Sequence, residues 1–396
     1  MSEIVYVRSI RMNFKKDLIE NILPFWLDNA IDNEEGGIFT CLDREGNVYG
    51  EEKSGWFQGR ALWTFSKAYN LIDKNPKYLD AAKRIYDFLI RTSAPDGRMA
   101  FLMTRNGRVI QQRRYFGAEK FAVMGCAEYY KASGDKTALL NARKYFNLVC
   151  DLHTGKYPTT PKYNPETRKT YGLSEVMSML WTAQVMRAID TEYSERYAGI
   201  CKACVDSFLT SGLLTDKALL ESVSVEGEFR DTPDGRIVNP GHSLEMAWFM
   251  MMEGALTDNR EAIEIAKKII DITLPLGLDK KHGGIIAFTD ADGKPPMQLE
   301  WDMKLWWPQC ETLIAMRLAY IMFGDEKYKK IYEELLKYVE KHFVDKEHGE
   351  WYGYLHYDNT VANTLKGNVF KGPFHIPRFY MIMTVLDECG DITKYM

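Results

Sequence analysis

The stretch that decides the fold is Glu35-Gly36-Gly37-Ile38-Phe39-Thr40-Cys41-Leu42-Asp43-Arg44-Glu45-Gly46-Asn47-Val48, because similar stretches return twice along the chain. The second begins at His282-Gly283-Gly284-Ile285 and the third at His348-Gly349-Glu350-Trp351. Each has a small or glycine-rich entry, alternating apolar residues and a polar turn. Such alternation around an Asp-Gly or Asn turn predicts a short β-hairpin. The recurrence indicates an internal repeat.

Between these stretches the apolar residues recur at helical spacing, which predicts twelve helices. The predicted helices span residues 13–30, 56–73, 76–92, 115–132, 136–149, 172–189, 192–211, 242–256, 260–275, 303–323, 326–342 and 374–389. Short polar turns follow the even-numbered helices, and long connections follow the odd-numbered ones.

Six helical hairpins without a linker predict an all-α fold, a closed (α/α)6 barrel with short β-hairpins in its long loops. No low-complexity run, Pro/Ser-rich stretch or charge block marks a boundary, so we expect one domain over residues 1–396. Because consecutive helices run antiparallel, all long connections should lie at one mouth, where all even-numbered helices begin. Ligand sites favour such loop-rich ends.

Composition excludes several classes of function. The net charge of -4 and the pI of 6.1 give no basic footprint for nucleic acid or an anionic membrane. No apolar run reaches the ~20 residues that span a bilayer, and residues 1–13 show no signal-peptide core. The seven cysteines are scattered, and the Cys201–Cys204 pair falls inside a helical pattern. We therefore expect buried thiols in a cytoplasmic protein.

Two histidines stand at predicted helix starts, in Asn239-Pro240-Gly241-His242 and in Phe374-His375-Ile376-Pro377-Arg378. The partial positive charge of a helix N-terminus favours neutral imidazole, which can accept a proton. Two such histidines facing one cavity would suit an enzyme that uses two bases for proton transfer. A capping or core role is the alternative for each histidine taken alone. No metal-binding motif appears, so we expect no metal site.

Other polar and aromatic residues should reach the same mouth. The polar ones are Arg60, Glu119, Glu175, Glu245, Lys304, Glu311 and Arg378, and the aromatic ones include Trp56, Trp63, Tyr115, Trp306 and Trp307. A polar cluster walled by aromatic rings suits a carbohydrate. Arg60 could stabilise an oxyanion or serve a structural ion pair. Glu311 could orient a histidine or bind a sugar hydroxyl.

The chain resembles a known family at four separated blocks, which occur in the family's order. The blocks are Trp56-Phe57-Gln58-Gly59-Arg60, Asn239-Pro240-Gly241-His242, Met303-Lys304-Leu305-Trp306-Trp307-Pro308 and Phe374-His375-Ile376-Pro377-Arg378. They are similar to the N-acyl-D-glucosamine 2-epimerase (renin-binding protein) family, over about residues 17–389. The resemblance implies an (α/α)6 barrel and reversible conversion of N-acetylglucosamine to N-acetylmannosamine, in amino-sugar or sialic-acid metabolism.

The resemblance also implies roles for individual residues. His242 and His375 match the acid/base histidines, and Arg60 and Glu311 match positions needed for activity. Around them we expect these residues to contact the sugar: Trp56, Gln58, Tyr115, Glu119, Glu245, Lys304, Trp307 and Arg378.

Regulation and assembly follow from the same resemblance. No cofactor is consumed, ATP is expected as an allosteric activator, and a homodimer is expected. The nucleotide would bind the basic loop at Lys162, Asn164 and Arg168, which could otherwise be a solvated loop. Gln309 departs from relatives that carry His there. Ser174-Glu175 departs from the isomerase relatives, which carry a further histidine in this helix, and this disfavours the isomerase reading.

The mechanistic hypothesis is abstraction of the C2 proton of the open-chain sugar by one histidine and its return to the opposite face by the other. Three alternatives remain. A sugar isomerase or a cellobiose-type 2-epimerase could use the same barrel. A glycoside hydrolase would need two opposed carboxylates, which Glu119, Glu175 or Glu311 could supply. A sugar- or protein-binding toroid would bind a ligand without turnover.

Overall fold

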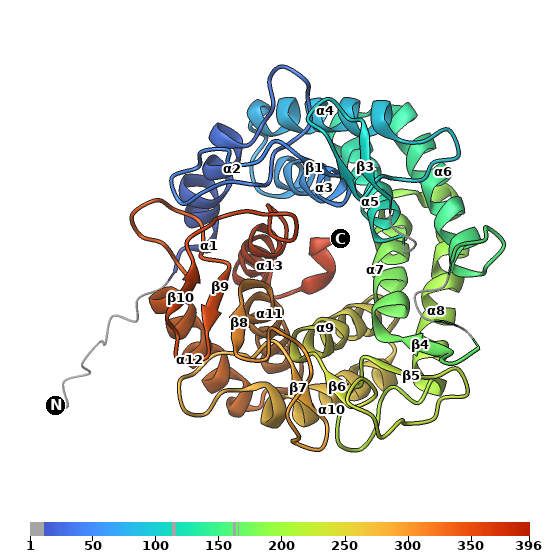
Figure 1. Ribbon diagram of the computed structural model, residues 1–396, viewed down its shortest axis with the longest axis vertical. Helices are drawn as coiled ribbons and strands as arrows, with labels where there is room; N and C mark the ends of the chain where they lie inside the picture. Colours follow the sequence, from blue (N-terminus) through green and yellow to red (C-terminus); the bar gives the residue numbers. More distant parts are fainter. Residues whose placement is uncertain (1–11, 113–115, 161–163, 165) are drawn as a thin grey trace.

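The computed structural model describes residues 12–112, 116–160, 164 and 166–396, which form two concentric rings of helices (Figure 1). The inner ring consists of α3 (Gly55–Leu71), α5 (Gly117–Ser133), α7 (Leu173–Ile189), α9 (Pro240–Thr257), α11 (Trp306–Phe323) and α13 (His375–Cys389). The outer ring contains α4 (Pro76–Thr92), α6 (Lys136–His153), α8 (Ser194–Thr210), α10 (Arg260–Gly277) and α12 (Glu326–His342). The N-terminal segment completes the outer ring. The predicted (α/α)6 barrel is confirmed.

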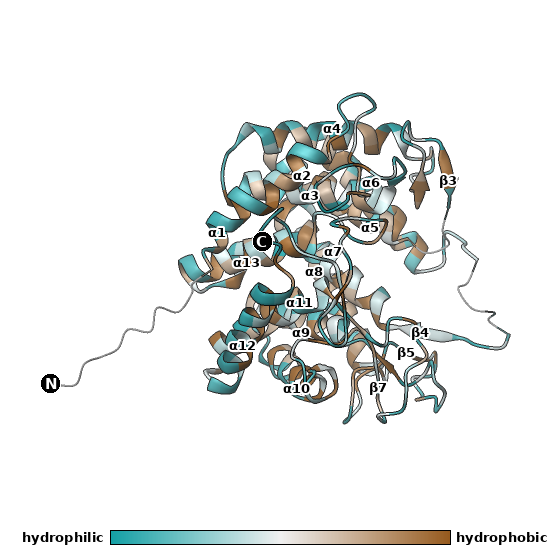
Figure 2. Cartoon of the chain, turned by 60° about the vertical axis from the view of Figure 1, so that its left-hand side comes forward, coloured by the Kyte–Doolittle hydropathy of each residue, from teal (hydrophilic) through white to brown (hydrophobic). Residues whose placement is uncertain are grey.

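The inner helices are the even-numbered helices of the sequence prediction. Each packs against the next inner helix, and α13 closes the ring against α3. The outer helices α4, α6, α10 and α12 start at short turns where an Asp or Asn side chain accepts a backbone N–H, as Asn75 does for α4 and Asp325 for α12. Their hydrophilic and hydrophobic residues form separate stripes (Figure 2). Inner helices such as α9 are buried almost all round, because they face both the outer ring and the barrel centre.

Two predicted helices differ from the structure. The first, predicted over residues 13–30, is divided into α1 (Phe14–Asp17), the π-helical turn η1 (Leu18–Ile22) and α2 (Leu23–Asn29), with Pro24 in the first turn of α2. Pro24 has no N–H to give to the helical ladder. The second, predicted over residues 303–323, begins as strand β8 (Met303–Leu305), and only then does α11 start. Pairing of β8 with a distant strand overrides the local helical pattern.

Short strands lie in the long connections, over one face of the ring (Figure 1). They form the sheets β1-β2-β3, β10-β9-β8, β4-β5 and β6-β7. Their bounds are Lys53–Ser54 (β1), Leu102–Met103 (β2), Val109–Gln111 (β3), Thr170–Gly172 (β4), Ser222–Ser224 (β5), Ile237–Val238 (β6), Thr289–Asp290 (β7), Tyr354–His356 (β9) and Val361–Asn363 (β10). The predicted hairpin at 348–359 continues into the antiparallel pair β9-β10, whereas β7 pairs with β6 from another connection. All these strands hold the loops over the starts of the inner helices.

An equivalent buried ion pair occurs at each of the three repeated stretches. Asp32, Asp279 and Asp345 each accept backbone N–H groups of the following turn, and each binds a buried lysine. The lysine Nζ to carboxylate distances are 2.7 Å for Lys53–Asp32, 2.7 Å for Lys304–Asp279 and 2.8 Å for Lys366–Asp345. We call these three pairs the loop staples, since each joins the turn to a segment later in the chain.

The repeat explains Gly37 and its counterpart Gly284. Both adopt positive φ, at 77° and 79°. A Cβ on Gly37 would lie 2.6 Å from Oε1 of Gln58, and one on Gly284 would lie 2.4 Å from the Tyr338 ring. The third copy carries Glu350 there, with φ 55°, and its carboxylate binds Lys371 at 2.7 Å.

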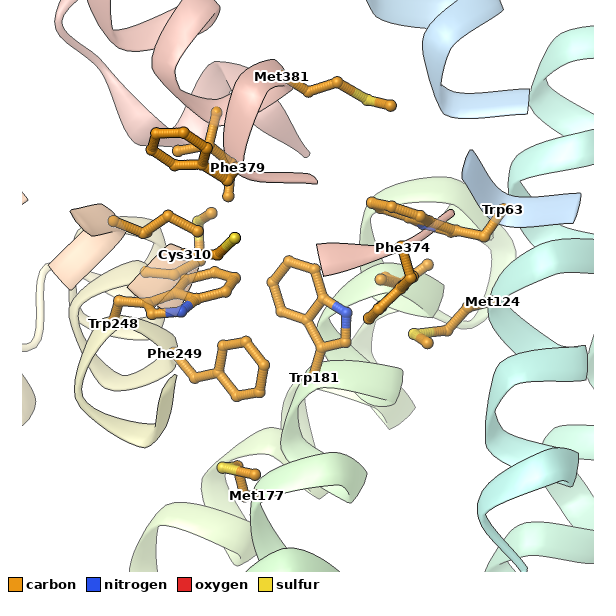
Figure 3. Packing of buried hydrophobic residues seen from close by; sticks show 14 of the residues in the cluster. Trp63, Met124, Met177, Trp181, Trp248, Phe249, Cys310, Phe374, Phe379 and Met381 are labelled. Atoms are coloured by element: carbon orange, nitrogen blue, oxygen red, sulfur yellow. The ribbon is translucent and has the colours of Figure 1, made fainter. Parts of the chain in front are cut away.

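The barrel centre is filled by aromatic and sulfur-containing side chains of the inner helices (Figure 3). Trp181 lies in the middle of this layer and stacks on Phe249, with ring centroids 4.7 Å apart. The short helix η3 (Ile392–Tyr395) brings the C-terminus into the middle of the ring (Figure 1), where Tyr395 contacts Trp63 and Trp181. In the described part of the chain, no helix has the length and apolar character needed to cross a bilayer.

Candidate active site

Both histidines lie at the starts of inner helices, and both imidazole rings lie beside the indole ring of Trp307. His375 is the first residue of α13, and His242 lies in the first turn of α9, where its backbone N–H is capped by Asn239. The ring centroid of Trp307, from the start of α11, lies 5.0 Å from that of His242 and 5.6 Å from that of His375. The closed inner ring thus brings residues 133 positions apart to one site beneath the loops.

His375 is held by a fully occupied carboxylate. Its Nδ1 lies 2.8 Å from Oε1 of Glu311, and Oε1 also accepts from Arg378 at 2.8 Å. The other oxygen, Oε2, accepts from the indole N–H of Trp248 at 2.8 Å. Glu311 therefore orients the histidine, and both of its carboxylate oxygens already have hydrogen-bond partners in the protein. Donation of Nδ1–H to this carboxylate leaves Nε2 of His375 as the proton acceptor.

His242 has its own carboxylate, which the sequence prediction missed. Its Nδ1 lies 3.0 Å from each oxygen of Glu221. Glu221 directly precedes β5, and its backbone is bound on both sides: its N–H donates to Ile237 and its C=O accepts from Leu173. Nothing local distinguishes Glu221 from the other acidic residues of its long connection. Only the pairing of β4 with β5 brings it to the site.

The two histidines have opposite pKa shifts. For His375, burial first and then the charges of Arg378 and Arg60 hold the pKa well below its usual value. For His242, burial lowers the pKa, but the charge and hydrogen bond of Glu221, with smaller contributions from Glu245 and Glu311, outweigh it, so the net shift is upward. A pair of titratable groups with pKa values pushed apart is a typical acid/base arrangement.

Arg60 lies in a box of aromatic rings. Its Cζ is 4.2 Å from the ring centroid of Phe121 and 4.6 Å from those of Trp56 and Phe374. No carboxylate of the described residues forms an ion pair with it, and burial lowers the pKa of Arg60 to about 9. Cation–π contacts thus hold a charged guanidinium that is free to receive an anion.

Arg378 lies between two carboxylates. It donates to Glu245 as well as to Glu311, and it is almost completely buried. Glu245, Glu311 and His375 lie close enough together to suggest metal ligands. The guanidinium of Arg378 already supplies the cation between the two carboxylates, so their charges are balanced by the chain itself.

Several predicted sugar contacts have other partners. Gln58 is fully buried, and its amide binds the backbone N–H and C=O of Ile38 at 2.9 Å. Lys304 directs its ammonium to Asp279, to the C=O of Tyr357 and to Asn359. The structure corrects both assignments, because neither residue has a donor left for a sugar. We exclude them from the site.

Glu119, predicted as a sugar contact, is buried and accepts from Arg98 at 2.6 Å. Tyr115 and Lys162 lie outside the described residues. Asn164 accepts the backbone N–H of Glu166 within its own loop, and Arg168 pairs with Asp234 of the next long connection at 2.5 Å. Trp56, Glu245, Trp307 and Arg378 remain at the histidine site.

The chain is similar to known sugar epimerases. The family model for N-acylglucosamine 2-epimerase matches residues 37–375. The N-acylglucosamine 2-epimerase of Bos taurus is 34% identical over 367 residues, covering 91% of this chain and 87% of that protein. The cellobiose 2-epimerase of Bacteroides fragilis is 24% identical over 403 residues, covering 96% and 99%.

Solved structures show the same fold. A cellobiose 2-epimerase from Bacillus thermoamylovorans superposes with a TM-score of 0.81 at 22% identity, covering 93% of this chain and 97% of that one. A D-mannose isomerase gives 0.81 at 20% identity, covering 95% and 98%. Since the family model covers most of the chain, this protein belongs to the N-acylglucosamine 2-epimerase family, whose members are isomerases acting on carbohydrates.

Proposed function

We propose that this enzyme interconverts N-acetylglucosamine and N-acetylmannosamine by two-histidine proton transfer at C2. The observation that carries the proposal is the pair His242 and His375, each held through Nδ1 by a glutamate and both in contact with Trp307. This leaves two Nε2 atoms to exchange a proton with one carbon. The similarity to mammalian N-acylglucosamine 2-epimerases supports the choice of sugar.

In the proposed mechanism the sugar first opens to its aldehyde, which makes the C2 proton acidic. One histidine removes this proton, and the electron pair moves onto the carbonyl oxygen to give an enediolate-like enolate. The unpaired cation of Arg60 is suited to stabilise that oxyanion, and such a donor contributes about 3–4 kcal/mol. The other histidine then protonates C2 from the opposite face, which inverts the centre.

A time course of N-acetylmannosamine conversion in D2O, followed by NMR, tests the proposal. We expect N-acetylglucosamine that carries deuterium at C2, because both histidines exchange protons with solvent. Product without the label would rule out the two-base route. If there is no conversion, the same experiment with mannose and cellobiose separates an isomerase or disaccharide epimerase from a binding protein.

The glycoside hydrolase alternative is less well supported by the site. Each of the three candidate carboxylates already has a cationic partner: Glu311 accepts from Arg378, Glu119 accepts from Arg98 through Oε1, and Glu175 pairs with Lys120 at 3.1 Å. Glycosidic cleavage that survives His242→Ala and His375→Ala but is lost in Glu311→Gln would favour it.

Three finer proposals rest on the family resemblance alone: activation by ATP without its consumption, a homodimer, and a cytoplasmic location. Repeating the NMR time course with ATP tests the first, and sedimentation at several protein concentrations tests the second. Localisation of the tagged protein in its native cell tests the third.

A further inference from the structure

We propose that Glu221 is the positioning residue of His242, and that it makes His242 the acid of the resting enzyme and leaves His375 as the base. The inference rests on the proposed two-histidine function and deepens it. Nothing in the four sequence blocks or in the family comparison points to Glu221.

The geometry around Glu221 suits this role. Both of its carboxylate oxygens lie 3.0 Å from Nδ1 of His242, and within the described residues its side chain has no other hydrogen-bond partner. Its backbone is bound to Ile237 of β6, the strand that leads into α9, and to Leu173 at the start of α7. Both hydrogen bonds hold the Glu221 backbone in place, so its carboxylate starts from a fixed position within reach of His242.

The two carboxylates differ in what else they bind. Glu311 shares its charge with Arg378 and Trp248 as well as His375, and Arg60 adds a second cation nearby. Among the described residues, the carboxylate of Glu221 pairs with His242 alone. A carboxylate beside an imidazole stabilises its cation, whereas adjacent guanidinium groups destabilise one.

The other titratable groups facing His242 agree with this assignment. Glu245 of the same helix and Glu311 of α11 also raise the pKa of His242, but less than Glu221 does, and both carboxylates are in direct contact with Arg378. His375 of α13 interacts unfavourably with a second imidazolium, so only one of the pair is charged at rest.

The proton balance gives each histidine one role. The sugar C2–H bond breaks and an N–H bond forms at Nε2 of His375. The Nε2–H bond of His242 then breaks as the new C2–H bond forms on the opposite face. The turnover ends with a cationic His375 and a neutral His242, and exchange with water restores the resting state. The resting enzyme is thus ready for the epimer whose C2–H faces His375.

The test is the variant Glu221→Gln, which keeps the shape and a hydrogen-bond acceptor but removes the charge. In the pH profile of kcat/KM, the alkaline limb reports deprotonation of the acid. We expect this limb to move to lower pH, the acid limb to stay, and kcat at pH 8 to fall at least tenfold with little change in KM. Glu228→Gln, an exposed glutamate in the same connection, is the matched control and should change neither limb.

Histidine NMR of the sugar-free protein gives an independent readout. With the His242 signals assigned from His242→Asn, we expect their titration midpoint to fall in Glu221→Gln and to be partly restored in Glu221→Asp. If Glu221→Gln does not fold, a lowered midpoint in Glu221→Asp relative to the wild type supports the same conclusion.

Two results would overturn the proposal: an unchanged midpoint and alkaline limb, or movement of the acid limb instead. If the wild type epimerises no sugar, the proposed function fails, yet the NMR titration still decides whether Glu221 controls the charge of His242.

Discussion

Arg60 is a buried cation whose charge is stabilised by ring faces instead of a carboxylate. Phe121, Trp56 and Phe374 surround its guanidinium, and its Nε has no hydrogen-bond partner in the described structure. Because burial lowers the pKa of Arg60 only to about 9, it is still charged at neutral pH. A buried cation that no carboxylate contacts directly is costly to the fold and useful for an anionic intermediate.

Replacing Arg60 should therefore reduce activity without reducing stability. In Arg60→Met we expect kcat/KM to fall by about 100- to 1000-fold, the usual effect of losing an oxyanion donor. The melting temperature should stay the same or rise, because an unpaired buried charge is removed. Steady-state kinetics and thermal melts check both parts. Activity within threefold of wild type would exclude Arg60 from the chemical step.

Glu311 should control the tautomer of His375. In Glu311→Gln the amide N–H2 can donate to Nδ1, which moves the proton to Nε2 and removes the base. By analogy with the catalytic triad carboxylate, kcat should fall by up to about 10⁴-fold. The control is Glu253→Gln, which breaks another glutamate–arginine pair, with Arg187, away from the site. It should lower the melting temperature with little change in kcat.

At the scale of elements, helical periodicity located all twelve helices, because their apolar spacing is local information. The strands depend on partners far away in the sequence. Residues 303–305 have a helical pattern but form a strand that pairs with β9. Strands β6 and β7 pair with each other although they belong to two different long connections. Glu221 and the lysine of each loop staple were missed or misassigned for the same reason. Lys304 stands beside Trp306 and Trp307 in sequence, yet its side chain turns to Asp279.

The buried lysine–aspartate pairs of the loop staples should contribute strongly to the stability of the fold. Lys304→Met leaves the carboxylate of Asp279 buried without its cation, and we expect unfolding to become easier by about 3–5 kcal/mol. The matched control is Lys83→Met, which breaks the exposed pair Lys83–Asp87 and should change stability by less than about 0.5 kcal/mol. Denaturant titration measures both. Equal effects would show that burial of the staple is energetically unimportant.

The staples also predict how acid affects stability. Burial opposes ionisation of Asp279, but the hydrogen bond and charge of Lys304 together with the backbone N–H groups of His282 and Lys281 outweigh it and lower the pKa to about 2. Its stabilisation is complete above the unfolded pKa, about 3.9, and is lost as the pH falls through about 2. The free energy of unfolding should thus fall less steeply between pH 4 and pH 2 in Asp279→Asn than in the wild type. Parallel slopes would contradict the assignment.

At the scale of the whole molecule, the ring is closed by elements from the two ends of the chain. The last helix, α13, packs against both α1 and α3, and η3 brings Tyr395 into the centre between Trp63 of α3 and Trp181 of α7. Each hairpin therefore needs its neighbours on both sides to bury its inner helix. This closure supports our proposal that residues 1–396 form one domain.

A single domain should unfold in one cooperative step. Substitutions of Tyr395, which lies at the barrel centre, test this expectation. We expect a single calorimetric transition that coincides with those seen by circular dichroism and tryptophan fluorescence. Tyr395→Ala should lower its temperature by removing about 3–5 kcal/mol of packing, without splitting it. Tyr395→Phe is the control: the hydroxyl is buried and has no partner among the described residues, so its loss should be neutral or stabilising. Two separate transitions in either variant would show that the ring contains independent units.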